Sequence, residues 1–244
     1  MPGDRVVLSP CPPCGRCYYC QRGEFSICVN SVDLMTSTFA DGSTRLSRDG
    51  EVVYRGLALG AFAELVTVNE NGAIKVGDDV PLEVACVLGC AVQTGVGAVI
   101  NTAKVEPGAT VLVTGAGGIG LSIIQGAVLA GASRIIISDP VAERRQVALD
   151  LGATDEIDPS EVDPAGAAFE LTAGIGVDYA FEGAGKGALV ETCINATRFG
   201  GTTVVVGAPG LEETASLDPV AFFTVSERKV MGCLLCSSNS RRDI

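Results

Sequence analysis

The sequence predicts an α/β protein in which a doubly wound, six-stranded parallel sheet follows a smaller and incomplete β domain. Strand-like and helical segments alternate after residue 91, a glycine-rich turn joins the first such strand to its helix, and residues 11–28 hold five cysteines. The 244 residues, 47% of them hydrophobic, are enough for one large domain or two modest domains with a sizeable core.

The net charge of the chain limits the classes of partner that we expect it to bind. Lys and Arg number 17 against 29 Asp and Glu, which gives a net charge of −12. An acidic surface repels phosphate backbones and anionic lipid, so we expect neither nucleic acid nor a membrane as a partner. Histidine is absent, which excludes an imidazole base or a histidine metal ligand from this chain.

Two uncharged stretches, 84–103 and 109–133, are long enough to cross a bilayer. Both are rich in glycine, and the second contains the turn GAGGIG, whose backbone groups would stay unpaired in lipid. We interpret them as a buried helix and a strand–turn–helix. The N-terminus, MPGDRVVLSPC, has no basic region followed by an apolar run, which predicts no signal peptide and a cytoplasmic location.

Residues 1–91 have the pattern of a small antiparallel β domain. We expect strands in three runs that are rich in apolar or β-branched residues, Arg5–Leu8, Val52–Tyr54 and Phe62–Val68. A Ser-, Asp- and Gly-rich loop occupies about 30–50, and a helix-like segment runs from Pro81 to Cys90.

Residues 92–237 have the rhythm of a dinucleotide-binding domain, and 238–244 begin a return segment. The predicted strands are Thr110–Thr114, Arg134–Ser138, Thr154–Ile157, Val177–Glu182, Thr202–Gly207 and Val230–Leu235. The predicted helices are 118–130, 141–151, 161–173 and 187–197. Strands this dense in Val and Ile are typical of a parallel sheet covered on both faces, and the expected strand order is 3-2-1-4-5-6.

Both ends of the sequence are abrupt. The chain opens just before a strand-like run and stops after the sixth strand in SSNSRRDI. Two interpretations remain, a compact protein with short termini or an internal fragment of a longer enzyme. The few short strands of the β domain favour the fragment.

The glycine-rich turn follows an apolar strand and opens a helix, which is the setting of a dinucleotide site. Its first glycine allows a tight turn, the second lets the backbone approach a pyrophosphate, and the third lets the helix pack on the strand; they are Gly115, Gly117 and Gly120. The N–H groups at the start of the helix then face the phosphates. A glycine turn without a ligand is the alternative.

The cofactor is predicted to be NAD. Asp139 lies nineteen residues beyond Gly120, at the end of the next strand, where a carboxylate accepts from the ribose hydroxyls and repels a 2′-phosphate. Arg144 and Arg145 lie near enough to accommodate such a phosphate, which keeps NADP as an alternative.

The cysteine-rich segment predicts a structural zinc site, because four thiolates close a tetrahedral coordination sphere. Two ligand sets compete: Cys11 with Cys14, Cys17 and Cys20, or the last three with Cys28. We favour the second, since a distant fourth ligand lets the loop wrap around the metal. An iron–sulfur cluster is the main rival, but no C-x3-C-P completes that pattern. Unligated surface cysteines are the third interpretation.

Taken together, these motifs resemble the zinc-dependent alcohol dehydrogenases of the medium-chain dehydrogenase/reductase superfamily. The resemblance covers nearly the whole chain and is closest to the class I and class III branch. It rests on the cysteine pattern, the glycine turn with Asp139, and further segments: Leu88-Gly89-Cys90, Thr94-Gly95, Asn101–Gly108, Gly152–Asp155, Val177–Glu182 and Val204–Gly207. It implies a Rossmann domain and a GroES-like domain.

The resemblance also implies roles for matching residues. Cys14, Cys17, Cys20 and Cys28 match structural zinc ligands, and Cys90 matches one catalytic-zinc ligand; without the resemblance Cys90 would be an ordinary buried thiol. Thr94 matches a residue beside the nicotinamide. Further matches to cofactor contacts are Gly118 and Ile119 for the pyrophosphate, Asp139 and Arg144 for the adenosine ribose, and Val206, Cys233 and Leu235 for the carboxamide.

The family implies an NAD-linked hydride transfer between a primary alcohol, or an S-hydroxymethyl thiol adduct, and the aldehyde, in a dimer or tetramer. Three family features are missing, however: another catalytic-zinc cysteine, a Gly-His-Glu segment and a Ser/Thr proton relay. One thiolate cannot hold an open zinc site, so we expect the isolated chain to be inactive. A non-catalytic module that binds NAD and zinc is the alternative. A zinc-free quinone-reductase-like enzyme is disfavoured, since such enzymes lack the cysteine lobe.

Overall fold

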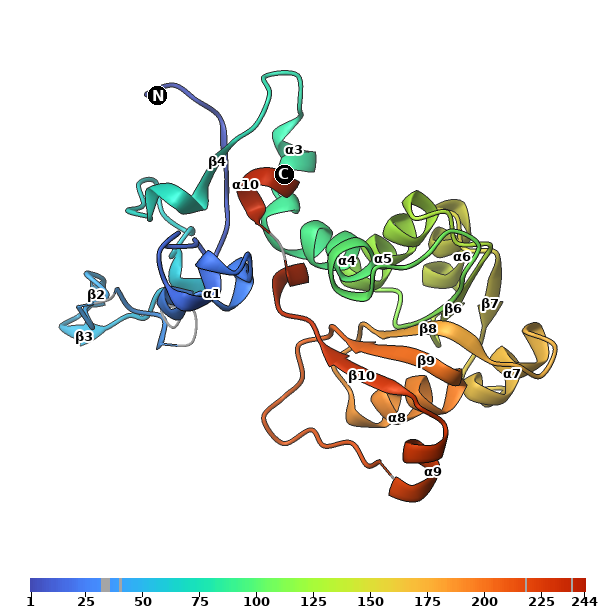
Figure 1. Cartoon of the computed structure of the whole chain (residues 1–244). Coiled ribbons are helices and arrows are strands. Elements are labelled where there is room, and N and C mark those ends of the chain that lie inside the picture. Colours follow the sequence, from blue (N-terminus) through green and yellow to red (C-terminus); the bar gives the residue numbers. More distant parts are fainter. Residues whose placement is uncertain (32–35, 40, 218, 238) are drawn as a thin grey trace. The chain divides into compact units, whose positions relative to one another are not determined.

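A computed structural model of the chain describes residues 1–31, 36–39, 41–217, 219–237 and 239–244. The chain forms two compact units, one of Met1–Gln93 with Ser237–Ile244 and one of Thr94–Cys236 (Figure 1). No helix of the described residues is long and apolar enough to cross a membrane.

The larger unit is built on a six-stranded sheet in which every neighbouring pair is parallel. Its strands are β5 (Thr110–Thr114), β6 (Arg134–Ser138), β7 (Asp155–Ile157), β8 (Val177–Glu182), β9 (Thr197–Val205) and β10 (Lys229–Gly232). They lie in the order β10-β9-β8-β5-β6-β7, which confirms the predicted 3-2-1-4-5-6 arrangement. Successive strands extend the sheet to one side from β5 to β7 and to the other side from β8 to β10, so the order reverses between β5 and β8. Ligands of doubly wound sheets bind at such a switch point.

Helices cover both faces of this sheet (Figure 1). They are α5 (Gly118–Leu129), α6 (Ala142–Asp150), α7 (Pro164–Leu171) and α8 (Gly187–Ala196), with α4 (Gln93–Gly97), a π-helical segment (Ala98–Ala103) and a short α9 (Val220–Val225). Successive strand residues point to opposite faces, so Val111 and Val113 pack with Ile123 of α5, whereas Leu112 packs with Ala168 of α7. Two apolar layers therefore enclose the sheet and explain its Val- and Ile-rich strands.

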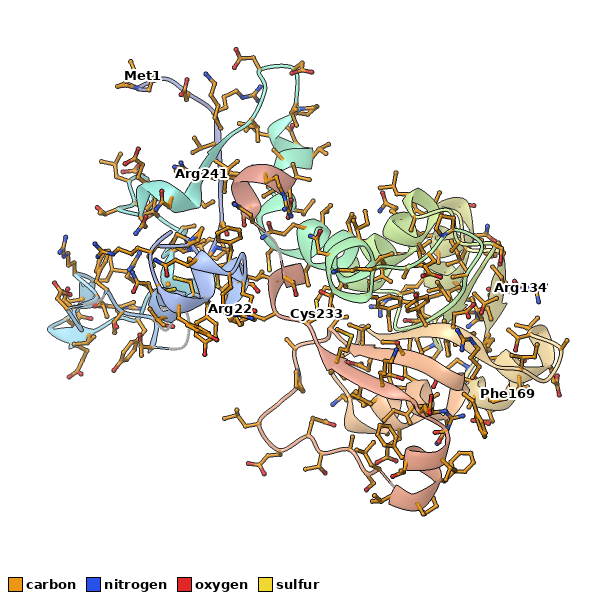
Figure 2. The ribbon with its side chains drawn as sticks, in the orientation of Figure 1. Met1, Arg22, Arg134, Phe169, Cys233 and Arg241 are labelled. Atoms are coloured by element: carbon orange, nitrogen blue, oxygen red, sulfur yellow. The ribbon has the colours of Figure 1, made fainter. Side chains whose placement is uncertain are left out.

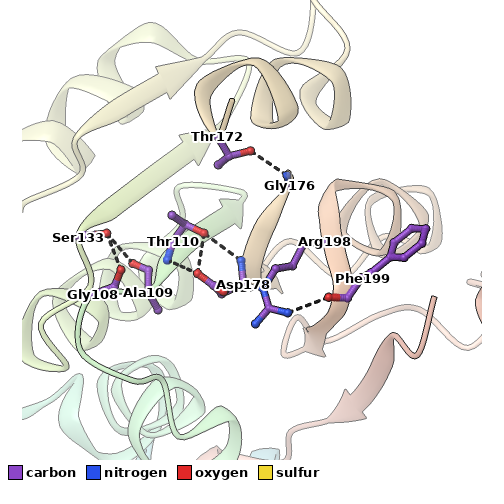
Figure 3. A network of polar contacts seen from close by, with 9 residues as sticks. All are labelled: Gly108, Ala109, Thr110, Ser133, Thr172, Gly176, Asp178, Arg198 and Phe199. Atoms are coloured by element: carbon purple, nitrogen blue, oxygen red, sulfur yellow. Dashed lines mark hydrogen bonds and ion pairs between the residues drawn. The ribbon is translucent and has the colours of Figure 1, made fainter. Parts of the chain in front are cut away.

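Asp178 ties three strands together at the amino end of the sheet (Figure 3). Its Oδ2 accepts from the backbone N–H and the hydroxyl of Thr110 at 2.8 and 2.9 Å, and its Oδ1 accepts from Nε of Arg198 at 2.7 Å. These contacts join β5, β8 and β9 at the edge opposite to the glycine turn.

The smaller unit consists of short elements. β1 (Val6–Leu8) pairs antiparallel with β4 (Ala73–Lys75), and β2 (Ser47–Arg48) pairs antiparallel with β3 (Glu51–Val52). The helices are α1 (Tyr18–Gln21), α3 (Leu82–Ala85) and α10 (Ser240–Asp243), with a π-helical turn at Leu88–Val92. 3₁₀ turns occupy Phe25–Ile27, Val29–Ser31, Gly56–Ala58, Glu70–Gly72 and Leu235–Ser237.

The C-terminal helix α10 belongs to this smaller unit. The Ser240 and Ser9 hydroxyls lie 2.9 Å apart, and Nη2 of Arg241 donates to the Glu70 carbonyl at 3.0 Å. The last residues of the chain therefore return to the first.

The structure corrects several predicted elements. Phe62–Val68 forms no strand, and the side chains of Phe62 and Leu65 are almost fully exposed. An alternating pattern makes a strand only where a second strand satisfies its backbone groups, and none of the described strands pairs with this segment. The helix predicted from Pro81 to Cys90 breaks after Ala85, and the last sheet strand ends at Gly232 instead of Leu235.

Candidate functional site

The glycine turn lies where β5 passes into α5, next to the switch point. Gly115 has a φ of +91°, and a Cβ there would stand 2.9 Å from the Ala184 methyl. A Cβ on Gly120 would overlap the Gly115 carbonyl, whereas one on Gly117 would meet nothing within 4 Å. The first and third glycines are therefore required by packing, and the second borders open space that a ligand can enter.

The N-terminus of α5 is suited to binding an anion. Gly117 is the N-cap residue and provides no side-chain hydrogen bond to the helix. Gly118 is exposed and Ile119 is partly buried. Uncapped N–H groups and the positive end of the helix dipole together favour a phosphate at this point.

The structure brings Asp139 against the glycine turn. Asp139 is only 4% exposed, and its Oδ2 accepts from the Ala116 N–H at 2.8 Å while its Oδ1 accepts from the Val141 N–H at 2.9 Å. Each carboxylate oxygen keeps a second lone pair with which it can accept from a ribose hydroxyl.

The two arginines that follow have different surroundings. Arg145 is buried in ion pairs with Glu156 at 3.0 Å and Asp158 at 2.9 Å, and the two acidic partners raise its pKa against the effect of burial. The side chain of Arg144 is 60% exposed, with Nη1 4.0 Å from Oδ2 of Asp139. Only Arg144 therefore has the freedom to meet a ribose or a 2′-phosphate.

The residues matched to the nicotinamide end lie in three segments. Val206 follows β9 and is buried, and its N–H donates to the Glu182 carbonyl at 2.9 Å. Cys233, labelled in Figure 2, follows β10 and donates its N–H to the Val205 carbonyl at 3.0 Å. Leu235 is buried and opens a 3₁₀ turn with a φ of +42°. Cys233 and Leu235 therefore lie beyond the sheet strand in which the sequence placed them.

Thr94 is a buried polar residue of α4. It is 5% exposed, and its Oγ1 has no hydrogen-bond partner among the described residues. A Cβ on the next residue, Gly95, would stand 2.6 Å from the Ile119 carbonyl, so α4 lies against the first turn of α5. The orphaned hydroxyl next to this helix start is suited to a ligand group.

The cysteine lobe gathers four sulfur atoms. The Sγ atoms of Cys14, Cys17, Cys20 and Cys28 all lie within 4.8 Å of one another. Cys17 caps α1, Cys20 lies within that helix, and Cys28 follows the 3₁₀ turn Phe25–Ile27. Tetrahedral zinc with four thiolates needs sulfur separations of about 3.8 Å, so a small contraction would complete the sphere. Cys11 is buried but is not in this group.

Backbone hydrogen bonds make one of these thiols acidic. The N–H groups of Cys20 and Val29 lower the pKa of Cys17 to about 6, whereas burial raises the pKa of Cys20 to about 12. Metal ligation requires thiolates, so the lowered pKa of Cys17 favours its role as a ligand.

Cys90 does not belong to the cysteine lobe. It is exposed in the π-helical turn Leu88–Val92, and desolvation of its sulfur raises the pKa of the thiol. Throughout the described part of the chain, the cysteine lobe is the one group of three or more potential metal ligands. Among the described residues, Cys90 therefore lacks the further ligands that a catalytic zinc site would need.

Sequence reasoning assigned no role to Glu182, the last residue of β8. It is 0% exposed, and one of its carboxylate oxygens accepts hydrogen bonds from the following loop. An acidic residue ending an otherwise mostly apolar strand was the available signal.

Comparisons with known proteins identify the family of this chain. A family model described as "Zinc-binding dehydrogenase" matches residues 118–244, and one described as "Alcohol dehydrogenase GroES-like domain" matches residues 1–78. The chain belongs to the zinc-dependent alcohol dehydrogenase family. Alcohol dehydrogenase B of Mycobacterium tuberculosis is 35% identical over 246 residues, which is 100% of this chain and 65% of that protein. The chain thus spans about two thirds of the length of its curated relatives.

Solved structures show the same relationship. An alcohol dehydrogenase zinc-binding domain protein from Burkholderia ambifaria superposes with a TM-score of 0.90 at 39% identity, and benzyl alcohol dehydrogenase from Acinetobacter calcoaceticus with 0.86 at 34%. Each match covers 98% of this chain and 65% of the other. A zinc-binding dehydrogenase from Sinorhizobium meliloti 1021, bound to NADP, gives 0.76 at 28% identity over 100% of this chain and 65% of that one.

Proposed function

We propose that this chain supplies the NAD-binding half and the structural zinc lobe of an alcohol dehydrogenase. NAD binds the domain predicted at 92–237, and zinc binds within the domain predicted at 1–91. The complete reaction is hydride transfer between a primary alcohol, or an S-hydroxymethyl thiol adduct, and its aldehyde. The observation that carries this proposal is the open glycine turn at the switch point, with the Asp139 carboxylate held against it.

Each segment at the switch point has a separate role in binding the dinucleotide. The N–H groups at Gly118 and Ile119 receive the pyrophosphate, and Asp139 accepts from the adenosine ribose. Main chain near Val206, Cys233 and Leu235 orients the carboxamide, and Thr94 offers its orphaned hydroxyl beside the ring. When bound, NAD supplies the hydride acceptor, while these residues fix its orientation.

The zinc of the cysteine lobe has a structural task. Four protein thiolates leave no coordination position for substrate, so this metal cross-links residues 14–28 instead of taking part in the reaction. The benefit is local stability in a unit whose own elements are short.

We propose that the isolated chain does not oxidise alcohols. The sequence has no histidine, and Cys90 is the sole predicted ligand of a catalytic zinc. The same observations favour a second candidate function, a non-catalytic module that binds NAD and one zinc ion. Turnover of alcohol by any assembly that contains this chain would decide against the module.

Two assays test these proposals on the purified chain. Fluorescence titration is expected to show NADH binding, with NADPH binding more weakly because Asp139 repels the 2′-phosphate. NADH production from benzyl alcohol is expected to stay at the background level. Absence of NADH binding refutes the cofactor role, tighter NADPH binding refutes the preference for NAD, and measurable turnover refutes the inactivity.

A further inference from the structure

Glu182 occupies a central place at the carboxyl edge of the sheet. It pairs with Thr114 of β5 on one side and with Val205 of β9 on the other. The chain continues from Thr114 into the glycine turn and from Val205 into Val206, which is matched to the nicotinamide carboxamide. Glu182 therefore lies between the two segments that would contact the dinucleotide.

The side chain of Glu182 organises the loop that follows it. Oε1 accepts from three consecutive backbone N–H groups, those of Ala184 at 2.8 Å, Gly185 at 2.7 Å and Lys186 at 3.3 Å. Oε2 is buried and has no hydrogen-bond partner among the described residues. Within that same part of the chain, no Lys or Arg forms an ion pair with this carboxylate. Its task is therefore hydrogen-bond acceptance and packing within the protein.

The loop in turn contacts both of these segments, the glycine turn and the segment after β9, which form the two walls of the predicted dinucleotide site. On the glycine-turn side, the Gly183 N–H donates to the Thr114 carbonyl at 3.0 Å, and Ala184 leaves no room for a side chain at Gly115. On the other side, a Cβ on Gly185 would stand 2.6 Å from the Ala208 carbonyl, and one on Gly207 would stand 2.7 Å from Oε2 of Glu182. The loop is thus a spacer of fixed thickness between the two walls.

We propose that Glu182 is a positioning residue for the dinucleotide. By holding the N–H groups of residues 184–186, its carboxylate sets the distance between the glycine turn and the segment after β9. The cofactor must touch both segments at once, so a displaced spacer weakens binding even though Glu182 itself touches no ligand. This role rests on the proposed NAD binding.

The test compares variants at the two ends of β8. Glu182→Met keeps the length of the side chain but removes both acceptors, and Glu182→Gln keeps one acceptor without the charge. Asp178→Leu is the matched control, because Asp178 also ties β5, β8 and β9 but at the far edge. NADH affinity is measured by fluorescence titration and stability by urea unfolding for each full-length variant.

We expect Glu182→Met to lose at least about tenfold in NADH affinity, as three amides lose their acceptor. Glu182→Gln should stay within about threefold of the wild type, because its amide oxygen can replace Oε1. Asp178→Leu should lose stability and keep its NADH affinity. Hydrogen exchange at amides 184–186 should accelerate in Glu182→Met and stay unchanged in Asp178→Leu.

Three results would overturn the role. One is a Glu182→Met protein that binds NADH as the wild type does; another is an equal loss of affinity in Asp178→Leu, which would make the effect one of general stability. The third is a Glu182→Gln protein as weak as Glu182→Met, which would assign the effect to charge. If the wild-type chain binds no NADH, the proposed function fails first and this role fails with it.

Discussion

At the scale of single residues, we propose that Asp139 sets the preference between the two nicotinamide dinucleotides. Its carboxylate is fixed by the N–H groups of Ala116 and Val141, with the exposed Arg144 beside it. A negative charge in this place disfavours a 2′-phosphate, while the nearby guanidinium favours one. We therefore expect the preference to reflect the balance of these two opposite charges.

We predict that Asp139→Asn weakens NADH binding by about tenfold, because a neutral amide accepts more weakly from the ribose hydroxyls. NADPH binding should improve in the same variant, since the repulsion is gone and Arg144 remains. Fluorescence titrations with both nucleotides measure the change. Adding Arg144→Leu should abolish the gain for NADPH; a gain that persists would show that another group receives the phosphate.

The five clustered cysteines are also expected to differ from one another in whether they bind zinc. Elemental analysis of chelator-washed protein is expected to find about one zinc per chain. Cys28→Ser should abolish that zinc and lower the unfolding temperature, because a three-thiolate site holds the metal less tightly. Cys11→Ser should retain the zinc, since Cys11 lies outside the group of four sulfur atoms. Zinc loss in Cys11→Ser alone would support the other ligand set, and iron in place of zinc would refute the site.

At the scale of elements, the amino ends of β5, β8 and β9 depend on one carboxylate. Partial burial by itself raises the pKa of Asp178, but hydrogen bonds from Thr110 and Arg198 outweigh it and hold the pKa below its usual 3.8. A carboxyl with a lowered folded-state pKa stabilises the fold above its unfolded-state pKa. That contribution is lost as the pH falls through the lower, folded-state value.

We therefore predict that the unfolding free energy falls as the pH is lowered from about 5 toward about 2, in part through Asp178. Asp178→Asn should be less stable than the wild type by about 1 kcal/mol at pH 7. The difference between the two proteins should narrow in acid, because the wild-type carboxyl becomes protonated there. Urea unfolding at a series of pH values measures this, and a difference that stays constant would contradict the assignment.

The elements also show which patterns a sequence can predict. Each of the six strands predicted for the larger unit overlaps an observed strand, although β9 begins five residues earlier than predicted. A parallel sheet buried on both faces produces continuous apolar runs that can be recognised in the local sequence. The segment Phe62–Val68 has the pattern of a strand but lacks a partner, and no local signal reports a missing partner. β4 and α9 were not predicted; each is short, and α9 has no buried residue to mark an apolar face.

At the scale of the whole molecule, β10 is one of the two edge strands of the six-stranded sheet, and β7 is the other. All four of its residues are exposed, including Val230 and Met231. An edge strand presents unpaired backbone groups that can extend the sheet into a second copy of the chain. We therefore propose a homo-oligomer that forms through this strand.

Light scattering of the purified chain is expected to give the mass of a dimer or a larger assembly. Val230→Lys places a charge on the pairing edge and should shift the mass toward 24.9 kDa, the mass of one chain. Leu211→Lys serves as the control, because Leu211 is even more exposed than Val230 but lies outside the sheet. A wild-type chain that is monomeric at all concentrations would refute the proposal.

The sequence by itself determined the approximate strand positions, the glycine turn and the cysteine-rich segment. Each of these follows from local periodicity or from a fixed spacing of residue types, which a linear chain displays directly. Tertiary structure decided which of two adjacent arginines stays exposed, because Arg145 pairs with Glu156 of β7 and with Asp158 in the loop after it. It also decided the place of Glu182, whose meaning depends on the distant segments that β5 and β9 bring to its sides. Such contacts join segments that are distant in the sequence and become neighbours only in the folded sheet.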